Sequence, residues 1–223
     1  YKTSGNTIMK EFWLYLHGLL SSPDSKKAIF LVEKIRNLGY QVEVMDRNPN
    51  KVAFENMTIE KELAQIGNEI NKTGAERVSI IGSSFGAMLA TLFAAINPIV
   101  RRLILLAPAF RISSSHIKQW NKSPYITQSK IQLEHPRYGQ VLMESSIIKG
   151  LISGHISDDF PLRDIPTLIL IGKRDEVIDL DLVRGFASKR MNTKVIELDS
   201  DHRMLDMLDI MASEIVDFLS STI

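Results

Sequence analysis

Three residue types that together can carry out acyl transfer occur along the chain in the order Ser84, Asp175, His202. A serine hydroxyl is a weak nucleophile until a base within hydrogen-bond reach takes its proton, and an acid behind the base keeps the base oriented. Serine, then acid, then histidine is one of the chain orders in which such triads occur. We therefore interpret Ser84 as a candidate nucleophile, His202 as its base and Asp175 as the acid.

The serine lies in the pentapeptide 82–86, whose sequence GSSFG fits the pattern GxSxG. An apolar run at 78–81 precedes it and a stretch of small residues at 85–97 follows, which is the strand, turn and helix context of a nucleophile elbow. The flanking glycines remove side chains that would collide at so tight a turn. A turn that merely caps a helix is the alternative, and this context makes it the less favoured one.

The acid is predicted from its position. Asp175 is the first carboxylate after an expected strand at 167–171, so it belongs at the same carboxyl edge of the sheet as Ser84. A residue next to His202 would have difficulty turning back onto that ring, and most other nearby carboxylates are expected to be solvated or to cap helices. The alternatives for the acid are Glu176, Asp179, Asp181 and Asp201.

Acyl transfer places negative charge on an oxygen, which two backbone N–H groups usually stabilise. One donor should be Phe85, directly after the nucleophile. The other should come from the turn after the first core strand, where Leu19 is the best candidate. We expect His17 in that turn to support it through a hydrogen bond rather than to transfer protons.

The loops that carry these residues can meet only if a sheet brings them to the same edge. The sequence predicts such a sheet. Short apolar runs alternate with amphipathic stretches of helical length, which is typical of a mostly parallel central sheet flanked by helices in the α/β class. Strands are expected at 12–16, 41–45, 78–81, 102–106, 167–171 and 195–198. Helices are expected from the Ser22-Pro23 pair to about 38, and at 58–72, 85–97, 180–189 and 205–219.

The alternation lapses between 109 and 161, which we interpret as a cap inserted into a single domain at 9–223. A cap over the carboxyl edge would form an acyl pocket. Its predicted lining residues are Phe110, Trp120, Tyr138 and Met143. The alternative is that such aromatic and methionine side chains pack their own segment onto the core.

The amino-acid composition argues against several classes of function and partner for this chain. The 223 residues are 44% hydrophobic, and 27 basic residues nearly balance 26 acidic ones, so a nucleic-acid partner is not expected. The chain has no cysteine, which excludes disulfides and thiolate metal sites and fits a cytoplasmic location. No apolar run reaches the roughly 18 residues of a membrane span. Residues 1–8 are polar and precede Met9-Lys10, and we expect them to be an expression remnant.

Four short segments resemble known enzymes. The turn LHGLLSSP at 16–23 and SKKA at 25–28 resemble small bacterial esterases of the α/β-hydrolase superfamily. The segment SDHRM at 200–204 and the pair Tyr138-Gly139 are similar to the mitochondrial α/β-hydrolase-domain depalmitoylase, an acyl-protein thioesterase. The resemblance spans about 12–219, with the insertion resembled only in patches. It implies the α/β-hydrolase fold and ester or thioester hydrolysis through an acyl-enzyme, without a metal or organic cofactor.

The predicted substrate is a small ester or thioester with a short to medium acyl chain, and the predicted assembly is a monomer or homodimer. A serine nucleophile disfavours the dehalogenases and epoxide hydrolases of this fold, which use aspartate there. Two alternatives stay open. One is hydrolysis of a carbon–carbon bond in a diketone by the same triad, and the other is a noncatalytic protein that binds an acyl ligand.

Overall fold

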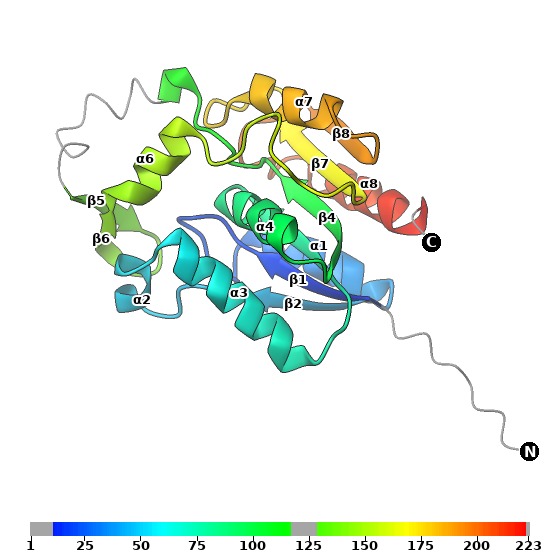
Figure 1. The fold of residues 1–223 in the computed structure, drawn as a ribbon, viewed down its shortest axis with the longest axis horizontal. Helices are drawn as coiled ribbons and strands as arrows, with labels where there is room; N and C mark the ends of the chain where they lie inside the picture. Colours follow the sequence, from blue (N-terminus) through cyan, green and yellow to red (C-terminus); the bar gives the residue numbers. More distant parts are fainter. Residues whose placement is uncertain (1–10, 117–128, 222–223) are drawn as a thin grey trace, which may run out of the picture.

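The computed structural model describes residues 11–116 and 129–221. Its centre is a sheet of six parallel strands in the order β2-β1-β3-β4-β7-β8 (Figure 1). The strands are β1 (Phe12–Leu16), β2 (Gln41–Met45), β3 (Val78–Ser83), β4 (Val100–Leu106), β7 (Thr167–Gly172) and β8 (Thr193–Leu198). The predicted parallel sheet is confirmed, and each expected strand is present within a few residues of its expected bounds.

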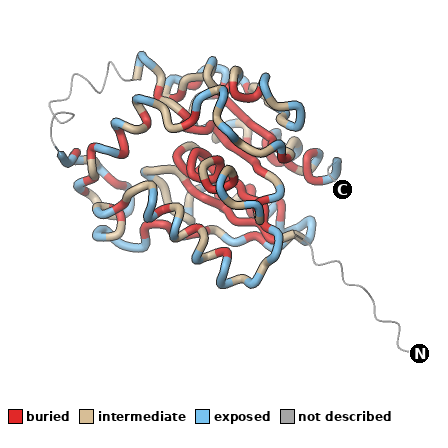
Figure 2. Tube along the Cα trace, viewed as in Figure 1, coloured by how far each residue is buried: buried red, intermediate tan, exposed pale blue. Residues whose placement is uncertain are grey.

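Helices cover both faces of this sheet. Helices α1 (Lys26–Asn37) and α8 (Leu208–Ser221) pack together on one face, and α3 (Ile59–Thr73) and α4 (Phe85–Ile96) pack on the other (Figure 1). Helix α7 (Leu180–Ser188) packs against β8. Coverage on both sides explains why β1, β3 and β7 are buried along their whole length. Figure 2 shows this burial concentrated in the central strands and in α4.

Two helices begin later than predicted. Ser25 has extended backbone and its hydroxyl accepts the Ala28 N–H at 3.4 Å, so Ser25 is the N-cap and α1 begins at Lys26 rather than at the Ser22-Pro23 pair. The expected helix at 205–219 begins instead at Leu208. Met204 has φ of 50°, in the left-handed region, and a turn at 205–206 separates it from the start of α8.

The segment after β4 contains more regular structure than the sequence interpretation expected. Strands β5 (Lys130–His135) and β6 (Gly139–Glu144) form an antiparallel hairpin outside the central sheet, and α6 (Ser145–Ser153) follows. The short helix α2 (Lys51–Glu55), also unpredicted, packs against β6. Arg137 pairs with Asp46 at 2.8 Å, and the Tyr138 hydroxyl donates to the Asn48 carbonyl. The hairpin turn is therefore fastened to the loop after β2.

Some predictions fall on residues that the structure does not describe. Trp120 and the expected remnant at 1–8 lie outside the described ranges. Within those ranges, no helix combines the length and the apolar character needed to cross a bilayer.

Candidate active site

The turn between β3 and α4 holds Ser84 in a strained conformation. Its φ of 53° and ψ of −113° lie in a region that residues with a side chain rarely adopt, at a cost of about 1–3 kcal/mol. Two hydrogen bonds fix it there: the Ser84 N–H donates to the Leu106 carbonyl at 2.8 Å, and the Ser84 carbonyl accepts the Ala109 N–H at 3.2 Å. The serine is thus held at the carboxyl edge of the sheet, between the ends of β3 and β4.

Gly82 and Gly86, on either side of this turn, are required because neighbouring backbone atoms occupy the space that a Cβ would need. A Cβ at Gly86 would lie 2.6 Å from the His17 carbonyl oxygen, and a Cβ at Gly82 would lie 2.6 Å from the Ala87 backbone nitrogen. Real Cβ atoms do not come so near to backbone atoms. Glycine therefore lets the start of α4 pack directly against the end of β1.

His202 lies between the other two residues of the predicted triad. Its Nε2 is 3.0 Å from Ser84 Oγ, and its Nδ1 is 2.7 Å from Asp175 Oδ2. An ionised carboxylate can only accept, so His202 Nδ1–H donates to Asp175 and the Nε2 lone pair is left to accept the Ser84 O–H. This arrangement suits removal of the serine proton by the histidine.

Asp175 is held firmly behind the histidine. Its side chain has no exposed surface, and its second oxygen, Oδ1, accepts the backbone N–H groups of Val177 at 2.9 Å and Ile178 at 3.1 Å. Those bonds orient the carboxylate, so that Oδ2 faces the imidazole.

The other carboxylates considered for the acid are used elsewhere. Asp179 accepts the Leu182 N–H at the start of α7 and pairs with Arg111, and Asp181 pairs with Arg184. Asp201 Oδ1 accepts the backbone N–H groups of Arg203 and Met204, and Glu176 is exposed. Among these five acids the structure places only Asp175 against His202. Its catalytic role stays a prediction.

The turn after β1 lies beside the serine because Leu16 pairs with Gly82 in the sheet. Arg47 Nη2 donates to the carbonyls of His17 at 2.7 Å and Gly18 at 3.1 Å. In a trans peptide the C=O and N–H point in opposite directions, so the Gly18 and Leu19 N–H groups point away from Arg47. In the described part of the chain, neither the Leu19 N–H nor the Phe85 N–H has a hydrogen-bond partner.

Arg47 is a site residue that the sequence analysis missed. It is fully buried, forms an ion pair with the buried Glu62 of α3, and its guanidinium also lies over the Phe85 ring, 5.4 Å from the centroid. It therefore touches the segments that carry both predicted oxyanion donors. No sequence signal marks it, because its contacts are 15 to 38 positions away and arise only in the folded chain.

His17 lies in the same network. Its Nδ1 is 2.9 Å from the Gly18 carbonyl oxygen, and burial together with the charge of Arg47 lowers the pKa of His17 to about 3. The ring is therefore neutral near pH 7. A buried neutral ring suits support of the turn, and this role of His17 stays a prediction.

A cavity of about 590 Å³ opens beside Ser84 and His202. One side of its wall comes mostly from the insertion and is formed by aliphatic residues: Ala109, Ile112, Leu133, Ile148, Leu151 and Val177. Leu19 and Phe85 also line it.

Three of the predicted pocket residues lie outside this lining. Phe110 packs against Phe186 with ring centroids 4.7 Å apart, and Met143 is fully buried on the inner side of the hairpin. The Tyr138 hydroxyl is bound to Asn48 and its ring stacks on His135. These bulkier side chains thus pack within the hairpin, against α7 and against the loop after β2, and the insertion presents smaller aliphatic residues to the cavity.

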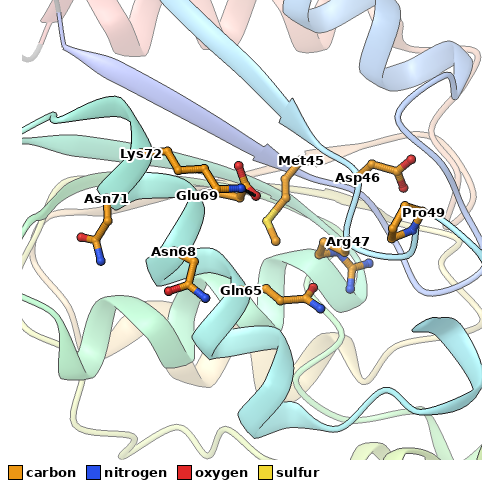
Figure 3. A pocket seen from close by; sticks show the side chains of 9 residues that line it. All are labelled: Met45, Asp46, Arg47, Pro49, Gln65, Asn68, Glu69, Asn71 and Lys72. Atoms are coloured by element: carbon orange, nitrogen blue, oxygen red, sulfur yellow. Dashed lines mark hydrogen bonds and ion pairs between the residues drawn. The ribbon is translucent and has the colours of Figure 1, made fainter. Parts of the chain in front are cut away.

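A second cavity of about 670 Å³ lies between the end of β2 and α3 (Figure 3). It is lined by Met45, Asp46, Arg47, Pro49, Gln65, Asn68, Glu69, Asn71 and Lys72. None of these is a serine, cysteine or histidine, so this lining offers no serine–histidine or cysteine–histidine pair. Nor do the described residues contain any group of three His, Cys, Asp or Glu placed to hold a metal ion.

Solved structures share this architecture at low sequence identity. Est1E from Butyrivibrio proteoclasticus, described with ferulic acid bound, superposes with a TM-score of 0.77 and 16% identity over 98% of this chain and 91% of its own. Mouse alpha/beta hydrolase domain-containing protein 10 gives 0.72 and 20%, over 94% and 90%. The Paleococcus ferrophilus monoacylglycerol lipase gives 0.74 and 16%, over 94% of each chain. Identities this low establish the fold and leave the activity open.

Sequence comparisons place the chain in a family. No curated protein matches it. Residues 12–220 match the model described as "Uncharacterised protein family (UPF0227)", which spans nearly the whole chain. The protein therefore belongs to the UPF0227 family and has the α/β-hydrolase fold.

Proposed function

We propose that the protein is a serine hydrolase that cleaves carboxylic esters or thioesters through an acyl-enzyme. The observation that carries this proposal is the continuous relay from Ser84 Oγ to His202 at 3.0 Å and from His202 to Asp175 at 2.7 Å. The strained backbone at Ser84 adds support, because such strain is concentrated at functional sites.

In the proposed reaction, Ser84 Oγ attacks the acyl carbon while His202 Nε2 takes the hydroxyl proton. The N–H groups of Leu19 and Phe85 donate to the oxyanion of the tetrahedral intermediate. His202 then returns the proton to the leaving alcohol or thiol, which departs as the acyl-enzyme forms. A water molecule deprotonated by His202 releases the acid, and Asp175 stabilises the imidazolium in both halves.

The buried network around Arg47 fits this mechanism. By binding the carbonyls of His17 and Gly18, Arg47 fixes the Leu19 N–H before substrate arrives. A donor that is already oriented pays no reorganisation energy during the reaction. We therefore assign Arg47 a positioning role.

The aliphatic wall of the cavity suits a short to medium acyl chain. We propose that the segment at 109–161 serves as the cap that supplies this wall. The same cavity would suit a diketone substrate or a bound acyl ligand that is never cleaved. Measured turnover of esters and of a diketone distinguishes these alternatives from ester hydrolysis. A cytoplasmic location rests on the lack of cysteine and stays a prediction.

The test is turnover of 4-nitrophenyl esters from acetate to decanoate, matched alkyl thioesters and a 1,3-diketone by the wild type and Ser84→Ala. We expect ester turnover with kcat lowered about 10⁶-fold in the variant, the loss measured for triad deletion in a serine protease. A Ser84→Ala protein that keeps a tenth of the activity would refute the mechanism. Cleavage of the diketone alone would replace ester hydrolysis with carbon–carbon hydrolysis.

A further inference from the structure

The charged side chains that line the cavity beside Ser84 are all basic. Lys26 and Lys27 from the start of α1, and Arg203 from the loop after His202, line it, and no described residue that lines it is Asp or Glu. The chain as a whole has 27 basic and 26 acidic residues, so this imbalance is local. The cations come from elements other than those that form the aliphatic wall.

Lys27 is the unusual member of this group. It is only 9% exposed, and its single hydrogen bond among the described residues runs from Nζ to Ser83 Oγ at 3.5 Å, the outer limit for such a bond. Within the described part of the chain, none of Lys26, Lys27 and Arg203 forms an ion pair. Buried lysines are rare in proteins unless they are paired.

Two carboxylates act on Lys27 through their charge, but neither forms an ion pair with it. They belong to Asp175 and Asp201. Asp175 accepts from His202 and two backbone N–H groups, and Asp201 accepts from the backbone N–H groups of Arg203 and Met204. Desolvation lowers the pKa of Lys27 to about 8, so the amine is still mostly charged at pH 7. No described carboxylate lines the cavity or forms an ion pair with Lys27, so an anion that enters the cavity can bind this buried cation directly.

We propose that Lys27, with Lys26 and Arg203 at the exposed rim, forms an anion subsite, and that the substrate is an ester or thioester carrying a carboxylate or phosphate group. This inference rests on the proposed serine hydrolase function. Lysine binds either anion as a point charge. Ser83, the partner of Lys27, directly precedes the nucleophile, and consecutive Cα atoms lie about 3.8 Å apart. Lys27 and Ser84 line the same cavity, so the anionic group and the attacked carbonyl would occupy that one cavity, with the apolar part of the substrate against the aliphatic residues.

The test compares esters that differ only in charge. The 4-nitrophenyl half-ester of succinate is matched with 4-nitrophenyl 4-methylpentanoate, its neutral isostere. A 3-phosphonopropanoate ester separates phosphate-type from carboxylate recognition. Butanoyl glycolate, matched with isobutyl butanoate, places the anion on the alcohol side instead. The quantity measured is the ratio of kcat/KM for the anionic ester to that for its neutral isostere.

We expect the wild type to favour an anionic ester in at least one pair. Lys27→Met should lower that ratio by about tenfold to a hundredfold, the range for a hydrogen bond to a charged group. Lys34→Met is the matched control, because Lys34 is exposed on the same helix and does not line the cavity. Arg203→Gln, on the exposed rim, gives a second variant that does not disturb buried packing, and it should lower the ratio less.

The results distinguish a failure of the anion subsite from a failure of the proposed hydrolase function. If neutral esters are cleaved while no anionic ester is favoured, or if Lys27→Met and Lys34→Met have the same ratio as the wild type, the anion subsite is wrong and ester hydrolysis stands. If no ester or thioester is cleaved and none acylates Ser84, the proposed function fails and the subsite fails with it. Thermal unfolding of each variant confirms that the comparison is made on folded protein.

Discussion

Replacing both members of the buried Arg47–Glu62 pair, as Arg47→Met/Glu62→Leu, removes the hydrogen bonds to the His17 and Gly18 carbonyls without leaving a charge unpaired. Arg47→Met alone would bury the Glu62 carboxylate without a partner, at a cost of about 3–5 kcal/mol. The double variant should lose less unfolding free energy than the single variant, because apolar replacements of buried ion pairs are often neutral or stabilising and the remaining cost comes from the His17 and Gly18 carbonyls that lose their donor. Activity can then be compared without a folding defect.

The catalytic effect follows from what Arg47 holds in place. Loss of one oxyanion donor costs about 10²–10³ in kcat. Without Arg47, the peptide between Gly18 and Leu19 can rotate, yet it still reaches the productive orientation part of the time. We therefore expect kcat to fall about 10²-fold, at the lower end of that range.

The assay is kcat for the best ester substrate, with urea unfolding measured on the same samples. The control is the partly buried pair between Arg102 of β4 and Glu11, which precedes β1 at the opposite edge of the sheet, with Arg102 Nε 2.8 Å from Glu11 Oε2. Arg102→Met/Glu11→Gln should change stability but not kcat. A double variant of Arg47 and Glu62 with kcat within threefold of wild type would refute the positioning role.

Substitutions at Asp175, Gly86 and Lys27 test the acid, the tight turn and the buried charge. Asp175→Asn should lower kcat about 10⁴-fold and the exposed Glu176→Gln should not, as measured by steady-state kinetics, and the reverse pattern would reassign the acid. Gly86→Ala should lower the urea unfolding free energy by about 1–3 kcal/mol, because its Cβ would lie 2.6 Å from a backbone oxygen. Gly67→Ala, where the nearest atom is a side-chain carbon at 3.7 Å, should be neutral or stabilising, and equal losses would contradict the close approach. Burial lowers the pKa of Lys27 from 10.5 to about 8, so between those pH values the unfolded chain binds a proton that the folded chain does not. The wild-type unfolding free energy should therefore rise with pH across that window by a few kcal/mol, and thermal melts of Lys27→Met should lack this rise.

The central sheet and the serine turn were predictable because their signals are local. Buried parallel strands appear as continuous apolar runs, and the glycines at 82 and 86 mark the tight turn around Ser84. Asp175 and His202 were placed by the rule that loops after parallel strands meet at one edge. Pairing of Gly172 with Leu198 at the ends of β7 and β8 brings those two loops together.

The hairpin in the insertion left a signal that the sequence analysis overlooked. Ile131 and Leu133 alternate with polar residues, and Val141 and Met143 lie two positions apart with the exposed Leu142 between them. A turn at 136–138, followed by Gly139, separates the two runs. Such alternation predicts a half-buried hairpin. The aromatic residues of the insertion were instead interpreted as pocket lining, although large side chains mostly pack against neighbouring parts of the protein.

Two features of the site could not have been predicted. The contacts of Arg47 with Glu62 and with the turn after β1 join three separate segments, and no local pattern encodes them. The burial of Lys27 depends on how α1 docks against the end of β3, which a helical pattern alone does not specify. Both are consequences of tertiary packing.

The central claim is that Ser84 is an activated nucleophile, and intact-mass spectrometry after treatment with a fluorophosphonate tests it most directly. The account predicts one adduct on the wild type and on Ser83→Ala, the neighbouring serine, and none on Ser84→Ala. An unmodified wild type, or an adduct that persists in Ser84→Ala, would contradict it.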